Sequence, residues 1–455
     1  MSFPAYPTYK DSGSEWIGTI PDHWPASPLK RAFEIEGGST PTPDEVNWDG
    51  DIAWVTPADL SGLSSLFLDS SKRTITATGL ASCGSTLLPA GSLILSTRAP
   101  IGSLAIALTS MCTNQGCKGL VPNANASAVY FAFVLLTAID ELKNRGRGST
   151  FLEISGDELS RFSVPTPPFA EQIKIARFLD HETVRIDALI EEQQRLIELL
   201  KEKCQAMISL AVTKGLDPTV PMKDSGVEWL GEVPEHWEVK QLKHVVDPNT
   251  SITYGIVQAG PEFEGGIPYI RTSDMSGEAL PISGYPLTSP EIDESYARSR
   301  VRPGDIVMSI RASVGKCLPV PDELKVANLT QGTAKISAGQ GVTRNFLLAF
   351  LNAEATQNYF DLMAKGATFK EITLDALRRT PVLLPPVGEQ IKIDQFVARN
   401  AGLLNETCKQ AIQSVSLLQE RRSALISAAV TGKIDVRGWQ PAASAPSPEL
   451  VEEAV

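Results

Sequence analysis

The apolar and polar positions of the chain follow two alternating patterns. In the first, short apolar runs are separated by glycine, proline and polar turns, which predicts β-strands. Four such runs are DIAWVTPADL (51–60), GSLILSTRA (91–99), IPYIRTSDM (267–275) and GDIVMSIRASVG (304–315). Two longer apolar runs, VYFAFVLLTAIDEL (129–142) and NFLLAFLNAEATQNYF (345–360), predict helices in the same regions. Each region is expected to be a mixed α/β domain of about 150 residues.

The second pattern starts after the prolines of VPTPPFAEQ (164–172) and VLLPPVGEQ (382–390). Proline is tolerated in the first turn of a helix but not in its interior. Downstream of each, apolar positions recur in steps of four and three, as imperfect seams of about five heptads. The first seam consists of Leu179, Thr183, Ile186, Ile190, Gln193, Ile197, Leu200, Cys204, Met207 and Ala211. The second consists of Val397, Ala401, Leu404, Cys408, Ala411, Val415, Leu418, Arg422, Leu425 and Ala429.

Each seam predicts a helix of about 40 residues, or about 60 Å, that ends near a glycine, Gly215 or Gly432. A heptad seam needs a partner, and the two helices are near copies of each other. The compact domain between them lets the second helix return along the first. We predict an antiparallel intramolecular coiled coil with one globular domain near each end. The alternative is that each helix packs separately on its own domain.

Several phrases occur twice in the same order, which indicates a tandem repeat. KDSGSEWIGTIPDHW (10–24) returns as KDSGVEWLGEVPEHW (223–237), with ten of fifteen positions identical, and EQIKI occurs at 171–175 and 389–393. Further pairs are STRAPIG (96–102) with SIRASVG (309–315), GSTFLEIS (148–155) with GATFKEIT (366–373), and ISLAVTKG (208–215) with ISAAVTGK (426–433). A duplication without functional meaning is the alternative to a protein that needs two similar heads.

The predicted fold class is α+β, with two mixed α/β domains separated by two long helices packed as an antiparallel intramolecular coiled coil. The predicted segments are globular domains at 1–168 and 216–386, long helices at 169–215 and 387–436, and a disordered tail at 437–455. The tail is assigned because it is acidic and rich in proline, alanine and serine.

Composition and charge narrow the class of protein. A chain of 455 residues exceeds one hydrophobic core. No apolar run approaches the roughly 20 residues that cross a bilayer, and no signal peptide is recognised, so no membrane partner is expected. The six cysteines form no CxxC pair, which favours reduced thiols in the cytoplasm. The net charge of −12 argues mildly against nucleic-acid binding, but a basic face can coexist with an acidic surface.

Catalytic motifs are scarce. GxGxxG and GxxxxGK[ST] are absent, and SVGKC (313–317) lacks the first glycine and the hydroxyl of a phosphate loop. TPPF (166–169) resembles a methyltransferase motif, but Thr166 lacks the required amide or carboxylate oxygen, so a helix-entry turn explains it better. His23 and His236 each precede a tryptophan and are interpreted as structural. No catalytic or metal-ligating residue is predicted, and a binding protein is favoured over an enzyme.

The repeated stretches resemble the specificity subunit of type I restriction–modification enzymes. They are KDSGVEWLGEVPEHWEVKQLK opening a domain, STRAPIG…TNQGCKGL in its middle and GSTFLEIS…VPTPPFAEQIKI closing it, and the resemblance covers about residues 9–436. It implies two target-recognition domains, each reading one half of a split DNA target, and helices that set the spacing. Because the two domains differ in sequence, the two half-sites are expected to differ.

The resemblance also implies partners. These are double-stranded DNA, two modification (methyltransferase) subunits docked on the helices, and restriction (translocase/nuclease) subunits. No cofactor is expected in this chain; S-adenosylmethionine, ATP and Mg are expected on the partner subunits. The alternatives are an assembly scaffold whose globular domains bind proteins, and a self-sufficient DNA-modifying enzyme.

Basic and amide side chains, several at repeat-related positions, are the predicted DNA contacts, because phosphates need cationic donors and base reading needs side chains that reach groove edges. They are Arg98, Asn114, Gln115, Lys118, Lys143, Arg145, Arg147, Arg271, Arg311, Lys316, Gln331, Lys365 and Lys370. The amides either bond an adenine edge or hold a loop in place. The alternative to DNA contact for the loops at 143–150 and 365–370 is that they are solvated surface loops. Arg271 has Thr56 as its rough counterpart, which marks a difference between the halves. Glu171 and Glu389 are expected to favour the positive ends of their helices.

Overall fold

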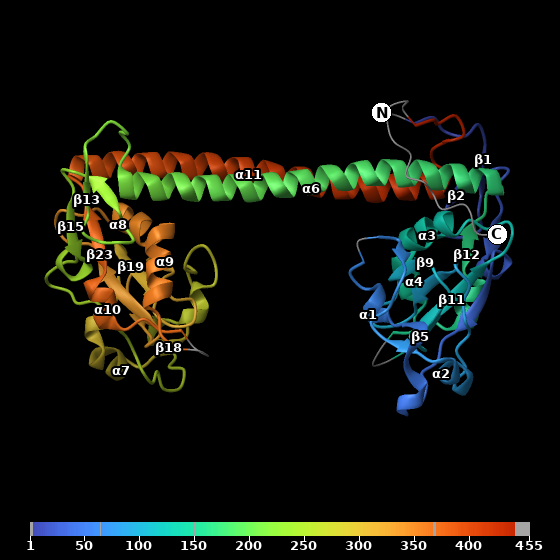
Figure 1. The fold of residues 1–455 in the computed structure, drawn as a ribbon, viewed down its shortest axis with the longest axis horizontal. Helices are drawn as coiled ribbons and strands as arrows, with labels where there is room; N and C mark the ends of the chain where they lie inside the picture. The colour runs from blue at the N-terminus through green and yellow to red at the C-terminus, as the bar shows by residue number, and fades with distance from the viewer. Residues whose placement is uncertain (1–2, 64, 149–151, 367–369, 442–455) are drawn as a thin grey trace. The chain divides into compact units, whose positions relative to one another are not determined.

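The computed structural model describes residues 3–63, 65–148, 152–366 and 370–441. The chain forms two compact units: Met1–Gln193 with Gln413–Val455 is called unit 1 here, and Gln194–Ile412 is called unit 2. Each unit contains one globular domain and a part of both long helices (Figure 1). The predicted segments treat each long helix as a separate piece, whereas in the structure each helix contributes to both units.

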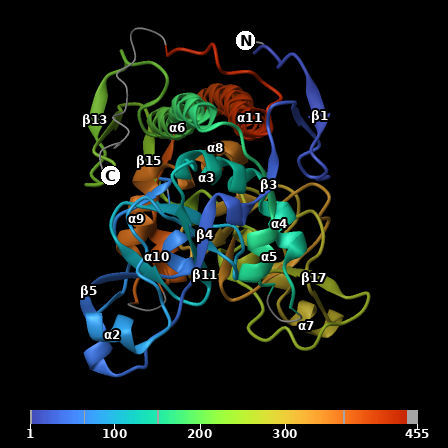
Figure 2. The ribbon, with the colours of Figure 1, turned by 90° about the vertical axis from the view of Figure 1, so that its right-hand side faces the viewer.

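The globular part of unit 1 is built around a five-stranded sheet with the order β4-β11-β8-β9-β6. In β8 (Leu93–Ser96) successive side chains enter different cores: Leu93 and Leu95 belong to one apolar cluster and Ile94 to another. Successive residues of a strand point to opposite faces of the sheet, so a strand covered on both faces reads as a continuous apolar run. In unit 1, α3 lies beside the long helices, and α2 lies at the opposite end of the domain (Figure 2).

The strands of unit 1 are β1 Tyr9–Asp11, β2 Thr19–Pro21, β3 Ala26–Pro28, β4 Phe33–Gly37, β5 Trp48–Val55, β6 Phe67–Leu68, β7 Thr74–Ile75, β8 Leu93–Ser96, β9 Leu104–Ala107, β10 Met111–Thr113, β11 Cys117–Pro122 and β12 Ser163–Pro165. Its short helices are η1 Leu29–Arg31, η2 Glu45–Asn47, α1 Pro57–Leu60, α2 Ala77–Ser82, α3 Ala128–Thr137, α4 Ile139–Arg145 and α5 Gly156–Arg161. A three-stranded sheet has the order β10-β5-β7, and the pairs β1-β2 and β3-β12 complete the unit.

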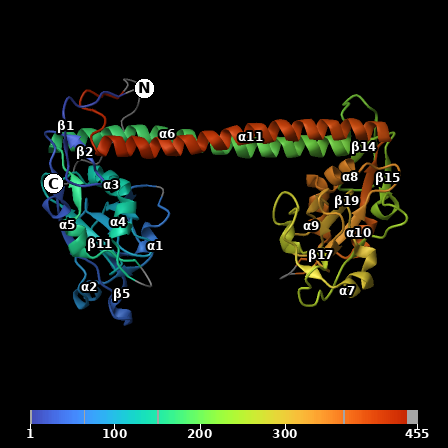
Figure 3. The ribbon, with the colours of Figure 1, turned by 180° about the vertical axis from the view of Figure 1, so that it is seen from behind.

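Unit 2 repeats this plan with a four-stranded sheet, β16-β22-β19-β20, and a three-stranded sheet, β18-β17-β21. In β19 (Asp305–Ser309), Ile306 and Met308 enter one apolar cluster and Val307 enters another. Within this unit α8 lies near the long helices, while α7 and β17 lie at the far end (Figure 3).

The strands of unit 2 are β13 Met222–Asp224, β14 Glu232–Pro234, β15 Glu238–Gln241, β16 Thr253–Tyr254, β17 Ile267–Ile270, β18 Leu287–Thr288, β19 Asp305–Ser309, β20 Cys317–Pro319, β21 Asn328–Leu329, β22 Thr333–Ser337 and β23 Pro381–Leu384. Its short helices are η3 Leu242–His244, η4 Thr272–Met275, α7 Pro290–Ser295, η5 Ala297–Ser299, α8 Arg344–Leu351, α9 Glu354–Met363 and α10 Leu374–Arg379.

The two predicted long helices are α6 (Phe169–Lys214) and α11 (Val387–Val430), slightly longer than expected. They lie antiparallel and side by side within each unit (Figures 1 and 3). All twenty predicted seam positions are buried or half-buried, and most positions between them are exposed. In unit 1 the helices are also joined by an ion pair, in which Arg422 Nε donates to Asp187 Oδ1 at 2.8 Å. The predicted coiled coil is confirmed, and Gly215 and Gly432 follow the helix ends with positive φ.

The repeated EQ and HW motifs attach each domain to its long helix. Glu171 accepts a hydrogen bond of 2.8 Å from Trp24 Nε1, and its other oxygen lies 2.8 Å from His23 Nε2. The adjacent Gln172 is buried and bonds three main-chain groups: its Nε2 donates to the Asn125 and Pro167 carbonyls, and its Oε1 accepts from Ser127 N. The sequence predicted that Glu171 interacts with the positive end of its helix, and these contacts were not predicted. The contacts of the glutamate and glutamine are called the clamp here.

Unit 2 contains the same clamp. Glu389 Oε2 accepts from Trp237 Nε1 at 3.1 Å and lies 2.7 Å from His236 Nε2. Gln390 Nε2 donates to the Gly341 and Pro385 carbonyls, and its Oε1 accepts from Thr343 N. The repeated letters therefore encode one repeated set of contacts.

Two helical runs are interrupted where single helices were expected. The run at 129–142 divides into α3 and α4 at Ala138. The run at 345–360 divides into α8 and α9 after Leu351, because the Asn352 side chain turns to the sheet. There Asn352 Oδ1 accepts from Cys317 N at 3.2 Å and its Nδ2 donates to Cys317 O at 2.9 Å.

The chain stays packed beyond residue 437, where the disordered tail was predicted to begin. Trp439 makes edge contacts with Phe178 and His181 of α6, with ring centroids 5.4 and 5.3 Å apart. The predicted start of the tail is too early, because this tryptophan covers apolar surface of α6. Residues 442–455 lie outside the described residues. Across the described ranges, no helix combines the length and apolar character needed to span a bilayer.

Candidate nucleic-acid interface

Arg98 and Arg311 occupy the same turn in the two units. Each follows a buried strand, β8 or β19, and each precedes an alanine with a left-handed backbone: φ is 45° at Ala99 and 63° at Ala312. Alanine rarely adopts this conformation, and such strained residues cluster at functional sites. The strained turn sets the direction in which each arginine leaves the sheet.

A glutamate from a returning segment meets each arginine. Arg98 Nη1 lies 3.9 Å from Glu153 Oε2, and Arg311 Nε lies 3.0 Å from Glu371 Oε1. The second contact is an ion pair without hydrogen-bond geometry, since the buried Arg311 Nε has no hydrogen-bond partner in the described part of the chain. The arginine side chains keep 34% and 41% of their surface exposed, so both remain open to a ligand.

The same glutamates bring a second predicted basic residue to each turn. The main chain of Glu153 bridges to both Arg98 and Arg147, and that of Glu371 bridges to both Arg311 and Lys365. The sequence placed these four basic residues in separate loops. The fold gathers them into two equivalent pairs.

The amide-containing segments lie beside these turns. Asn114 Oδ1 accepts from Gly116 N at 2.9 Å, and Gln115 Oε1 accepts from Thr40 Oγ1 at 2.5 Å. A Cβ at Gly116 would lie 3.2 Å from Arg98 Nε and 2.9 Å from Pro57, so glycine lets this segment approach the arginine. The side-chain oxygen of Asn114 therefore has a partner inside its own loop, and that of Gln115 has a partner in the loop that follows β4.

In unit 2 the corresponding segment forms one wall of a groove of about 480 Å³. Three predicted DNA contacts, Arg271, Arg311 and Gln331, line this groove together with Thr272 and Tyr269. A Cβ at Gly332 would lie 2.3 Å from Thr272 Oγ1, so a larger residue would displace the Thr272 side chain or the segment itself. The groove presents two guanidinium groups and one amide on a single surface.

Arg271 precedes η4 and is held by the carboxylate of Asp274, the third residue of that helix. Its Nε donates to Asp274 Oδ2 at 3.2 Å and its Nη2 donates to Oδ1 at 2.9 Å. These hydrogen bonds raise the pKa of Arg271 above its ordinary value, so the guanidinium stays charged.

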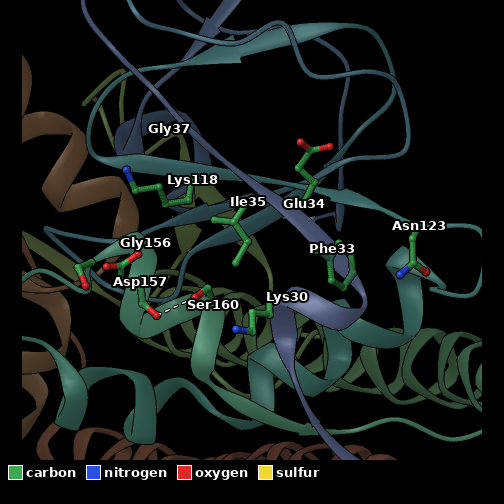
Figure 4. Close-up of a pocket in the computed structure, with 11 residues that line it drawn as sticks. Lys30, Phe33, Glu34, Ile35, Gly37, Lys118, Asn123, Gly156, Asp157 and Ser160 are labelled. Carbon is green, nitrogen blue, oxygen red and sulfur yellow. Dashed lines mark hydrogen bonds between the residues drawn. The ribbon is translucent and has the colours of Figure 1, made fainter.

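Lys118 lies elsewhere in unit 1, in a pocket of about 730 Å³ at the edge of the five-stranded sheet (Figure 4). The pocket also contains Lys30, which was not among the predicted DNA contacts although Lys243 stands at the equivalent position of the repeat. Two acidic residues, Glu34 and Asp157, line the same pocket, and Asp157 O accepts from Ser160 Oγ at 2.8 Å. The pocket is thus of mixed charge.

The remaining predicted residues contact acidic or main-chain groups. Lys143 Nζ lies 3.4 Å from Asp140, and Lys370 Nζ lies 3.0 Å from Asp361. Lys316 Nζ donates to the Ser276 carbonyl at 3.0 Å.

Arg145 turns toward the domain. It pairs with Glu141 at 3.0 Å and Glu158 at 3.5 Å, and its guanidinium carbon lies 5.0 Å from the ring centroid of Phe162. These contacts give Arg145 a structural role whatever else it does. Within the described residues, no group of three or more His, Cys, Asp and Glu side chains is arranged to hold a metal ion.

Comparison with known proteins places this arrangement in a family. A family model described as the type I restriction modification DNA specificity domain matches residues 21–200 and again residues 234–414. The MjaIX type I restriction enzyme specificity subunit of Methanocaldococcus jannaschii is 34% identical over 238 residues, which are 50% of this chain and 53% of that protein. The chain thus matches about half the length of this relative. The EcoBI specificity subunit of Escherichia coli is 25% identical over 74% of this chain and 70% of its own length.

Two solved structures share the fold. A chain from a structure described as the basis of complex assembly and conformational transition of the type I R-M system has a TM-score of 0.65 at 18% identity. The alignment covers 91% of this chain and 99% of that chain. The HsdS subunit from Thermoanaerobacter tengcongensis has a TM-score of 0.54 at 17% identity, covering 91% and 98%.

Proposed function

This chain belongs to the type I restriction modification DNA specificity family, and from that premise we propose that each of its two units reads one half of an asymmetric split duplex target. The observation that carries the proposal is the repeated turn of Arg98 and Arg311, each beside a strained alanine and a glycine-backed amide segment. Each turn offers a partly exposed cation for phosphate, and the groove in unit 2 adds an amide that reaches a base edge.

The net charge of −12 fits this proposal if the negative charge lies away from the DNA-binding faces. The exposed side of α6 carries the acidic run at 191–192 and further glutamates, which would repel phosphate and suit protein contacts. Leu189, Leu196 and Leu199 are also exposed on this helix. Apolar side chains rimmed by charge are typical of protein interaction sites.

The helices are therefore proposed to dock two modification subunits and to set the spacing between the half-sites. In this proposal the chain performs no catalysis. S-adenosylmethionine is bound and used by the modification subunits, and ATP and Mg by the restriction subunits. The contribution of this chain is to hold a chosen DNA sequence where those partners act.

A direct test is DNA selection with the complex of this chain and its modification subunits. The complex is expected to enrich a split sequence from random duplexes, and its affinity is expected to fall steeply with salt as phosphate counterions are released. A complex that binds tightly but without sequence preference contradicts the proposal. Absence of salt-dependent DNA binding favours a protein scaffold. Methylation of DNA by the isolated chain favours a self-sufficient enzyme.

A further inference from the structure

The groove in unit 2 contains an arginine whose orientation is fixed before any ligand arrives. Asp274 receives the Arg271 side chain at two oxygens and also accepts from the Arg271 backbone N at 2.8 Å. The carboxylate is only 12% exposed, whereas the arginine side chain is 48% exposed. A carboxylate that is largely shielded from solvent therefore holds a guanidinium that is about half exposed.

The pairing with Asp274 occupies one edge of the guanidinium and leaves the other edge available to a ligand. Nε and one N–H of Nη2 point to the carboxylate, so the N–H groups of Nη1 and the second N–H of Nη2 remain at the outer edge. Two parallel donors at this spacing match O6 and N7 of guanine in the major groove, the commonest specific arginine contact to DNA. A phosphate also accepts such a pair, but without sequence preference.

Unit 1 has the same aspartate without the arginine. Thr56 stands where Arg271 stands, and Asp59 Oδ2 accepts from Thr56 Oγ1 at 2.6 Å and from Thr56 N at 2.8 Å. The other oxygen of Asp59 accepts from Lys72 N at 3.0 Å. Both units therefore keep the carboxylate that caps this turn, and only unit 2 uses it to orient a guanidinium.

We propose that Arg271, positioned by Asp274, reads a guanine in the half-site bound by unit 2. In unit 1, Thr56 at the equivalent position does not select guanine. The inference rests on the proposed function, and it adds the base that is read and the side chain that reads it. Asp274 is a positioning residue: it fixes the plane of the guanidinium and does not contact the base.

The test is sequence selection from random duplexes with the complex of full-length chain and modification subunits. It compares wild type, Arg271→Thr, Arg271→Lys and Asp274→Asn, with Arg379→Thr as a matched control. Arg379 is also an exposed arginine of unit 2 paired with an aspartate, Asp375, at 3.0 Å. Thermal unfolding of each variant is measured alongside.

Arg271→Thr is expected to reduce the preference for guanine at one position of one half-site by about tenfold to a hundredfold and to leave the other half-site unchanged. Arg271→Lys is expected to lose most of this preference because lysine lacks the fork. Asp274→Asn is expected to weaken it partly, and Arg379→Thr to leave it intact.

Three results overturn the inference alone. They are an unchanged profile in Arg271→Thr, a uniform loss across all positions, and the same positional loss in Arg379→Thr. A wild-type complex without sequence preference instead overturns the proposed function.

Discussion

Glu171 accepts a hydrogen bond of 2.8 Å from the buried indole of Trp24, across 147 residues of sequence. Glu389 receives the same bond from Trp237 in unit 2. The glutamate is the first letter of EQIKI and the tryptophan the last of the PDHW and PEHW motifs. These two repeated motifs lie far apart in sequence, and together they fix the start of each long helix against the first segment of its domain.

Replacing Glu171 with alanine is expected to destabilise unit 1. The change leaves the Trp24 N–H buried without its acceptor, which costs about 1–3 kcal/mol. Glu389→Ala is expected to do the same in unit 2. The measurement is urea unfolding of the full chain, with Glu191→Ala, an exposed glutamate on α6, as the control. Equal stability of the clamp variants and the control would show that the clamp contributes nothing.

Replacing Arg98 or Arg311 with alanine is expected to weaken DNA binding by the complex. If each arginine neutralises one phosphate, its loss lowers the slope of log affinity against log salt by about one. Titrations at several salt concentrations measure both quantities. Arg379→Ala, outside the groove, serves as the control. The assignment of these arginines is wrong if both variants keep wild-type affinity and slope.

Gly332→Ala is expected to reduce DNA binding without unfolding the chain. The new Cβ would lie 2.3 Å from Thr272 Oγ1, so the Thr272 side chain must rotate or the segment that carries Gln331 must shift, and either change alters the lining of the groove. Gly388→Ala, where nothing lies within 4 Å of the added carbon, is the matched control. Binding assays and thermal unfolding separate a local shift from a general loss of structure. Unaltered affinity in Gly332→Ala would remove the groove from the interface.

The stability of unit 1 is expected to fall as the pH rises above about 9. Burial raises the pKa of the Cys112 thiol to about 11 and that of Cys117 to about 12, above the ordinary value of 9.0. The unfolded chain therefore releases these protons first, so the stabilisation present below pH 9 is lost as the pH rises toward 11–12. The loss is about 3 kcal/mol for Cys117 at pH 11.

Urea unfolding of wild type and Cys117→Ala at pH 8 and pH 11 measures this loss. The difference in stability between the two pH values is expected to be smaller in Cys117→Ala than in wild type. Cys83→Ala removes a half-buried thiol and is the control. The explanation fails if Cys117→Ala and wild type lose the same stability over this interval.

The repeat and the heptad seams could be recognised from the sequence because each is a regular pattern of residues along the chain. Heptad spacing from Leu179 to Ala211 predicts which face of a helix is buried, and a near copy at 397–429 supplies its partner. Short apolar runs between turn residues, such as 91–99, identified the strands for the same reason. The helix breaks at Ala138 and Asn352 were not predicted. The break at Asn352 depends on Cys317, a residue distant in sequence.

The sequence by itself determined that this chain is a doubled unit of mixed domain and long helix, since periodicity and repetition need no knowledge of distant contacts. Only the tertiary structure decided which basic residues lie near one another. It bridged the main chains of Arg98 and Arg147 to Glu153, bridged those of Arg311 and Lys365 to Glu371, and turned Arg145 onto Phe162. It also gave Arg271 its carboxylate anchor and its place beside Arg311 and Gln331. The physical reason is that a charge acquires its role from the groups that surround it, and strand pairing and packing over long sequence separations set those surroundings.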